Sequence, residues 1–225
     1  MRERFRQELK NLKADVVAIG KDVTGLTRDA VTSLVGGEVE RAERVIAADD
    51  EIDRRCLGIE ERALETIATQ SPVARDLRLL HSLTYIAMHL ERMADLSVNI
   101  AKATRRTAGR RGPQTLYDLI QAQGNLVYRV LDATMEALEK SDLELARKLP
   151  ELDEPIDHLY KQFFRELARL HDEEDIEWAS SMVLASRYLE RIADNAVDIG
   201  ERIAFLVTGE FDVLLSETAE PPTSA

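Results

Sequence analysis

The sequence predicts an all-α protein built from two tandem three-helix bundles, six helices in all, that are related by an internal repeat. The first observation is composition: the 225 residues contain only 10 Gly and 6 Pro, while Ala, Leu, Glu and Arg are abundant, as in helical proteins. The second is that apolar residues recur at helical spacing along almost the whole chain. The third is a segment that occurs twice, once in each half.

Three helices are expected in the first half of the chain. The first covers about residues 3–35 and ends at a pair of glycines, and the second covers about residues 38–69. The third runs to about residue 106. Its start is indicated by Ser71 followed by Pro72, the pattern of an N-cap and a proline at the first helical position.

Three further helices are expected in the second half, at about residues 115–140, 141–170 and 176–208. The middle one should start at a capping-box pattern that begins with Ser141. Two prolines, Pro150 and Pro155, lie inside it, so we expect it to be kinked or broken there.

A short stretch rich in Gly, Pro and charge lies near the middle of the chain and has no apolar anchor, which is typical of a linker. The expected domains are a first bundle at 1–108, a linker at 109–114, a second bundle at 115–210 and a disordered tail at 211–225.

The duplicated segment supports this division. Residues 90–100 align with residues 189–199 at an offset of 99, and seven of these eleven positions are identical. Earlier in each half, residues 49–53 match residues 153–157 at Asp, Ile and Asp, with an offset of 104. The two halves therefore look like two copies of one three-helix unit.

Both copies carry carboxylates four residues apart. The pairs are Asp49 with Asp53, Glu91 with Asp95, Asp153 with Asp157, and Glu190 with Asp194, and Asn99 and Asp198 extend two of these rows. On a helix this spacing puts the side chains on one face, where like charges repel by roughly 0.2–0.5 kcal/mol per pair. The rows lie beside the apolar stripes, at the shoulder of the core. They form either a solvated acidic face or a site for Mg, Mn or Fe, since such metals accept oxygen ligands.

An arginine follows the glutamate in both copies of the duplicated segment. Arg92 and Arg191 could orient a group or contact a partner. Alternatively, they form structural salt bridges to a neighbouring helix, for instance with Asp76 or Asp175, which are also 99 residues apart.

Charge and residue counts exclude several classes of protein. The 42 acidic and 30 basic residues give a net charge of −12, which argues against a nucleic-acid-binding surface. One cysteine excludes a disulfide framework and a thiolate metal cage within one chain. Because no signal peptide and no membrane-spanning run are visible, we expect a cytoplasmic protein.

The histidines argue against a redox enzyme. None of the four lies three residues after a glutamate, so the Glu-x-x-His motif of di-iron carboxylate enzymes is absent. No nucleophile has an evident base, and we predict no catalytic residue. A carboxylate-bridged metalloenzyme and a purely structural helical scaffold remain the alternatives to a binding protein.

The duplicated segment, with Glu-Arg-x-x-Asp in both copies, resembles the PhoU family, the accessory and regulatory proteins of the bacterial phosphate-specific transport system. Residues 70–78, Gln-Ser-Pro-Val-Ala-Arg-Asp-Leu-Arg, are similar to the family's junction between its second and third helices. Residues 205–210 are similar to its end. The resemblance covers nearly the whole chain.

The resemblance implies two tandem three-helix bundles with multinuclear metal sites on the Glu/Asp-x-x-x-Asp motifs. Mapped onto this sequence, the motif residues are Asp49, Asp53, Glu91, Asp95, Asp153, Asp157, Glu190, Asp194 and Asp198. Two positions depart from the family pattern. Asn195 stands where many members have His, and Asn99 replaces a carboxylate, so the first bundle should bind metal differently or less tightly.

The resemblance also implies a role without catalysis. Family members help a sensor histidine kinase and the ATPase subunit of the phosphate transporter to report phosphate sufficiency, which keeps phosphate-starvation genes off. They commonly form homodimers, and they meet the membrane only through these partners.

Overall fold

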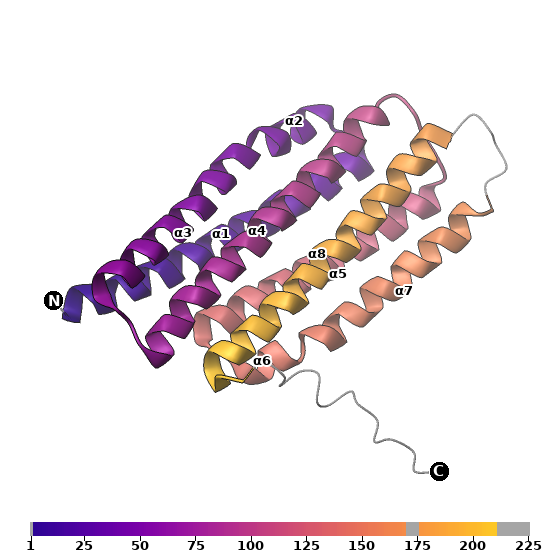
Figure 1. The fold of residues 1–225 in the computed structure, drawn as a ribbon. Helices are drawn as coiled ribbons and strands as arrows, with labels where there is room; N and C mark the ends of the chain where they lie inside the picture. The colour runs from indigo at the N-terminus through magenta and orange to yellow at the C-terminus, as the bar shows by residue number, and fades with distance from the viewer. Residues whose placement is uncertain (1, 170–175, 211–225) are drawn as a thin grey trace, which may run out of the picture.

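The computed structural model describes residues 2–169 and 176–210, and within them it contains helices and no strand. Figure 1 shows the arrangement. The helical segments are α1 (Arg2–Gly36), α2 (Val39–Ala47), α3 (Asp49–Gln70), α4 (Ala74–Arg106), α5 (Gln114–Lys140), α6 (Leu143–Arg147), α7 (Leu149–Leu167) and α8 (Ile176–Thr208). The all-α prediction is confirmed. The gap at 171–175 between the last two predicted helices and the predicted tail at 211–225 lie outside the described residues.

Two of the six predicted helices are each divided by a single residue. The predicted fifth helix breaks at Lys148, just before Pro150, whereas Pro155 lies inside α7 without ending it. The predicted second helix breaks at Ala48, which no Gly or Pro indicated. The three acidic residues of the first turn of α3, which begins at Asp49, explain the restart, because negative charge is favourable at a helix N-terminus.

The predicted helix starts at two serines are wrong. Ser71 adopts a left-handed conformation with φ 46° and ends α3, and α4 begins only after Val73, which is extended. Ser141 is likewise left-handed, with φ 54°, and ends α5. The N-cap of α6 is the next residue, Asp142, whose carboxylate accepts a hydrogen bond from the Leu145 N–H at 3.0 Å.

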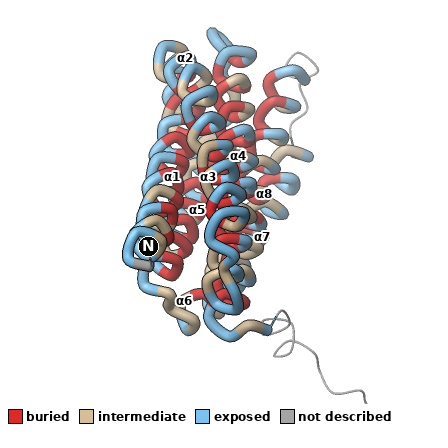
Figure 2. The backbone as a smooth tube through the Cα atoms, turned by 60° about the vertical axis from the view of Figure 1, so that its left-hand side comes forward, coloured by how far each residue is buried: buried red, intermediate tan, exposed pale blue. Residues whose placement is uncertain are grey.

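Each half of the chain forms a bundle, and the two bundles share one hydrophobic core. α1 packs on α3 and α4, α5 packs on α7 and α8, and the pairs α1–α5 and α4–α8 join the halves. In Figure 1, α3, α4, α8 and α7 lie side by side, with α1 and α5 behind them. Figure 2 shows the buried positions on the sides of the helices that face one another.

An approximate twofold axis relates the halves and passes between α4 and α8. These helices are antiparallel, since Arg202 lies over the Tyr85 ring at 3.8 Å and Asp198 lies 3.8 Å from His89. In this register, residues related by the offset of 99 meet near Ala94 and Ala193, which are fully buried. The α4–α8 contact is therefore the place where equivalent residues of the two repeats come together.

The connection between the halves is fixed by one aromatic residue. Trp178, at the start of α8, is fully buried and donates a hydrogen bond from Nε1 to the Tyr117 hydroxyl at 2.9 Å. The connection passes so close to it that a Cβ on Gly112 would lie 2.2 Å from the indole ring. None of the helices in the described part of the chain has the length and apolar character needed to span a membrane.

Candidate functional site

The first acidic cluster consists of Asp49 and Asp53 on α3 and Glu91 and Asp95 on α4. Burial raises the pKa of Asp49, and the charges of Asp53 and Asp95 raise it further. Burial also raises the pKa of Glu91, as do Asp95, Asp53 and Asp49. The pKa of Asp53 is also raised, first by burial and then by the charge of Asp95. The two predicted rows therefore face each other between α3 and α4, where the neighbouring charges disfavour ionisation of Asp49, Asp53 and Glu91.

The second acidic cluster consists of Asp153 and Asp157 on α7 and Glu190 and Asp194 on α8. Burial and the charge of Asp157 raise the pKa of Asp153 to about 7. Burial raises the pKa of Asp194, and Asp157 adds to the effect. Glu190 is 8% exposed, and its pKa is raised by burial and then by Asp194. The arrangement of the first cluster thus recurs in the second repeat, with stronger desolvation.

Three buried carboxylate oxygens in these clusters have no hydrogen-bond partner within the described residues. Two of them, Oδ1 of Asp49 and Oδ1 of Asp153, are at equivalent positions of the two repeats, and the third is Oε2 of Glu190. A buried oxygen with lone pairs and no donor is costly unless a proton or a cation satisfies it. The donor set of each cluster is oxygen only, which fits Mg, Mn or Fe.

The carboxylates of each cluster do not surround a single point. Among the described residues, no three His, Cys, Asp or Glu side chains are grouped so that they could hold one metal ion. In each cluster the carboxylates instead form rows on two neighbouring helices. A bound cation would have to draw these side chains together.

The clusters differ in their neighbouring cations. Arg187 donates a short hydrogen bond from Nη1 to Oε1 of Glu190, one turn along α8. The equivalent position in the first repeat is Met88, which carries no charge. The second cluster therefore has an arginine hydrogen-bonded to one of its carboxylates, whereas the cation that acts on Asp49 in the first cluster is Lys102. Arg187 was not among the predicted site residues, although its position three residues before Glu190 indicated a possible ion pair on one helix face.

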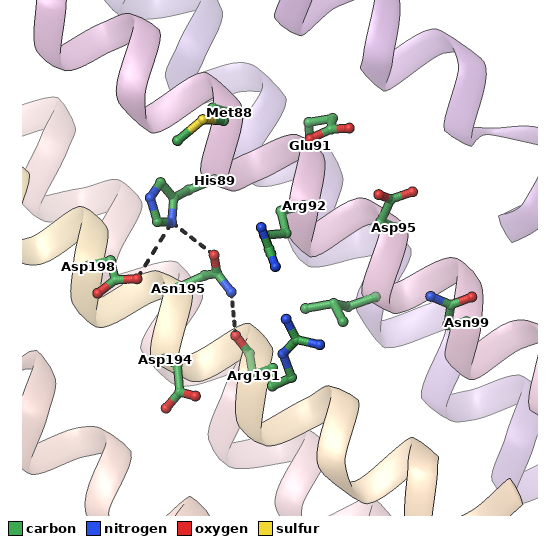
Figure 3. A pocket seen from close by; sticks show the side chains of 11 residues that line it. Met88, His89, Glu91, Arg92, Asp95, Asn99, Arg191, Asp194, Asn195 and Asp198 are labelled. Atoms are coloured by element: carbon green, nitrogen blue, oxygen red, sulfur yellow. Dashed lines mark hydrogen bonds and ion pairs between the residues drawn. The ribbon is translucent and has the colours of Figure 1, made fainter.

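Asn99 and Asp198, predicted as extensions of the rows, lie beside the clusters, and the charge of Asp198 contributes to the raised pKa of Asp194. They line a polar pocket of about 650 Å3 on the α4–α8 contact, which we call the seam pocket, together with the cluster carboxylates Glu91, Asp95 and Asp194 (Figure 3). His89 also lines it, and its ring Nδ1 lies 2.8 Å from the Asn195 Oδ1. The Asn195 amide in turn donates to the Arg191 carbonyl at 2.6 Å. Burial lowers the pKa of His89.

Arg92 and Arg191 both line the seam pocket. Neither forms an ion pair or side-chain hydrogen bond among the residues that the structure describes, so the expected salt bridge of Arg92 to Asp76 is not found. Asp175, the partner expected for Arg191, is outside the described residues.

Comparison with known proteins identifies the family. The family profile described as the PhoU domain matches residues 16–104 and 120–203. A PhoU homologue of Methanothermobacter thermautotrophicus, named a phosphate-specific transport system accessory protein, is 29% identical over 92% of this chain and 95% of its own length. A relative of the same name from Rhizobium meliloti is 32% identical over 91% of this chain and 87% of its own.

Comparison with solved structures leads to the same family. The crystal structure of PhoU from Pseudomonas aeruginosa superposes with a TM-score of 0.87 at 28% identity, covering 92% of this chain and all of that one. The phosphate transport system regulatory protein PhoU from Streptococcus pneumoniae gives a TM-score of 0.84 at 28% identity, with 92% and 98% coverage. By its sequence in both halves and by its fold, the chain belongs to the PhoU family.

Proposed function

We propose that this protein is a non-catalytic regulator of phosphate transport that keeps phosphate-starvation genes off while phosphate is plentiful. It acts in the cytoplasm as a homodimer, through a sensor histidine kinase and the ATPase subunit of the phosphate transporter. The proposal is supported by the names of the relatives, which are accessory proteins of the phosphate-specific transport system and match over nearly their whole length. Arg92 and Arg191 are available on the α4–α8 surface for contact with a partner.

Metal binding by the two acidic clusters is part of this proposal. The observation that carries it is the unpartnered oxygen at Asp49 and again at Asp153, equivalent positions of the two repeats. In each cluster the four carboxylates would hold the ions, and the bound charge would join α3 to α4 and α7 to α8. The metal supplies charge neutralisation, and the carboxylates supply its ligands.

Two other functions make different predictions. A carboxylate-bridged metalloenzyme would turn over an oxidisable substrate when loaded with iron, and the sequence lacks the Glu-x-x-His motif of that class. A purely structural scaffold would carry no stoichiometric metal after purification and would not be stabilised by Mg or Mn.

Deleting the gene should derepress phosphate-starvation genes in phosphate-rich medium, because the repressing input to the kinase is lost. Transcript levels of a starvation-induced phosphate transporter gene, compared with those of the complemented deletion strain, measure this. Unchanged expression in the deletion strain would refute the regulatory role.

Replacing Arg187 by Met, its equivalent in the first repeat, should strengthen metal binding at the second cluster. The substitution removes the cation that occupies Glu190, so an incoming metal no longer displaces it. Titration of Mn into the metal-free protein, followed by its melting temperature, should show the transition at a metal concentration about tenfold lower than in the wild type, the effect of one charge-assisted hydrogen bond.

Replacing Arg147 by Met is the control, since that arginine pairs with Glu144 at 3.4 Å, away from both clusters. A titration midpoint that is unchanged by Arg187→Met would show that Glu190 is not a ligand.

A further inference from the structure

A groove of about 660 Å3 runs between α3 and α4 on the outer surface of the first repeat, and we call it the apolar groove. Leu57 and Leu64 line it from α3, and Met88 lines it from α4. These three side chains are 54%, 59% and 56% exposed. Large apolar side chains that are exposed singly are normal on a protein surface, whereas a group of them along one groove indicates that another segment covers it.

The apolar groove belongs to the first repeat. At the positions equivalent to Leu57 and Met88, the second repeat has Lys161 and Arg187. The family's shared architecture therefore does not require an apolar surface here. An occupant of the groove is expected once per chain, although the three-helix unit occurs twice.

The two ends of the groove differ in charge. Asp53 and Glu91 of the first acidic cluster line one end. His81 lines the other end, where the Arg202 guanidinium of α8 lies 3.4 Å from its Nδ1. The end next to α8 is thus the basic one, and it suits a segment that brings a carboxylate in first and apolar side chains after it.

The C-terminus of α8 lies beside this basic end. Gly209 follows α8 directly, and a Cβ on it would lie 3.4 Å from the guanidinium carbon of Arg78, one turn before His81 on α4. The Nε of Arg78 is buried and has no hydrogen-bond partner among the described residues. In Figure 1 the end of α8 and the start of α4 lie at the same end of the molecule.

The sequence that continues from this point matches the groove. Residues 211–215, which lie outside the described part of the chain, are Phe-Asp-Val-Leu-Leu. Leu215 is six residues beyond Gly209, which allows at most about 20 Å of extended chain. The ten residues from Arg78 to Met88 span about 15 Å along α4, so the segment is long enough to reach the apolar side chains.

We propose that residues 211–215 of the same chain bind in the apolar groove between α3 and α4. Phe211, Leu214 and Leu215 cover its exposed apolar side chains, and Asp212 brings a carboxylate to the basic end, near Arg78. The expectation of a disordered tail then applies only to its polar part, residues 216–225. The inference goes beyond the proposed function and does not depend on it: a partner that uses this groove has to displace the tail.

Disulfide cross-linking in the full chain tests the proposal. Glu60 lines the groove, so Glu60→Cys combined with Ser216→Cys should form a disulfide within one chain under mild oxidation. The control pair is Glu61→Cys with Ser216→Cys, because Glu61 is also exposed but does not line the groove. Mass spectrometry of non-reduced digests should show the first disulfide forming at least tenfold faster. Burial raises the pKa of the native Cys56 thiol to about 12, so it reacts slowly.

The apolar residues of the tail should determine this rate. Adding Leu214→Ser and Leu215→Ser to the first pair should slow the cross-link about tenfold or more, because the tail loses apolar surface to bury. Adding Thr223→Ala, in the polar part, should leave the rate unchanged. Equal rates for the two cysteine pairs, or a rate that does not respond to the leucine substitutions, would overturn the proposal. A disulfide between two chains, formed faster at higher protein concentration, would assign the groove to a second copy and would also overturn it.

Discussion

Asp153→Asn is expected to stabilise the metal-free protein by roughly 1–2 kcal/mol at pH 8. The folded chain holds this carboxyl at a pKa of about 7, whereas the ordinary value is 3.8, so ionisation at pH 8 opposes folding. The full linkage value is larger, but the side chain is only half-buried and solvent screens its neighbours. The amide has the same shape, carries no charge and can donate to the carboxylates around it.

The same pKa fixes the sign of the pH dependence. Because the folded carboxyl binds its proton more tightly than the unfolded one, the metal-free wild type gains stability as the pH falls through 7 and keeps gaining toward 3.8. Urea unfolding of the metal-free protein at pH 8 and pH 6 should show this gain in the wild type and a smaller one in Asp153→Asn.

Metal should reverse the effect of the substitution. At a metal concentration about 100 times the dissociation constant, binding stabilises a protein by about 2.7 kcal/mol, and Asp153→Asn should lose most of the share that belongs to the second cluster. The control is Glu154→Gln, which removes a charge from the exposed neighbouring residue. If Asp153→Asn and the wild type gained equal stability from Mn, Asp153 would not be a ligand.

Trp178→Ala should cost about 3–5 kcal/mol of the free energy of unfolding, the range for deleting a fully buried large aromatic side chain. The indole fills the space beneath the connection at Gly112, and its N–H satisfies the Tyr117 hydroxyl. Urea unfolding followed by circular dichroism measures the loss.

Two variants make the Trp178 result specific. Trp178→Phe keeps most of the apolar volume and should cost less than the alanine variant. Ile176→Ala, two residues earlier at a side chain that is 66% exposed, should change stability by about 0.5 kcal/mol or less. A loss from Trp178→Ala as small as that from Ile176→Ala would contradict the close packing of the connection.

Much of the fold could be read from the sequence because helical periodicity and the repeat are local signals. The helix starts could not be predicted in the same way. Ser71 and Ser141 have side chains typical of an N-cap, but each adopts a left-handed conformation and ends the preceding helix. The break at Ala48 was also missed, although the acidic run that follows it was visible.

The candidate site could likewise be predicted only in part from the sequence. Pairs four residues apart remain on one face, and the structure brings Asp49 and Asp53 opposite Glu91 and Asp95 as carboxylate rows. A third residue of such a row, eight positions along the helix, points away from the face of the first two, because eight residues correspond to a rotation of about 80°. Asn99 therefore does not join the carboxylates that act on one another between α3 and α4, and it lines the pocket on the α4–α8 contact. Contacts between helices, such as His89 with Asn195, depend on packing and had no signal in the spacing.

The shared core across α1–α5 and α4–α8 has a consequence for how such a chain can be divided. Cutting it at the connection would expose two apolar helix faces on each half, each shaped to receive a similar half in antiparallel orientation. A single half would self-associate through these exposed apolar faces. The full-length protein therefore resembles a dimer whose two halves are joined in one polypeptide. Unlike the subunits of a homodimer, the two halves can differ in sequence, as they do at Asn99 and Asp198 on the two sides of the axis.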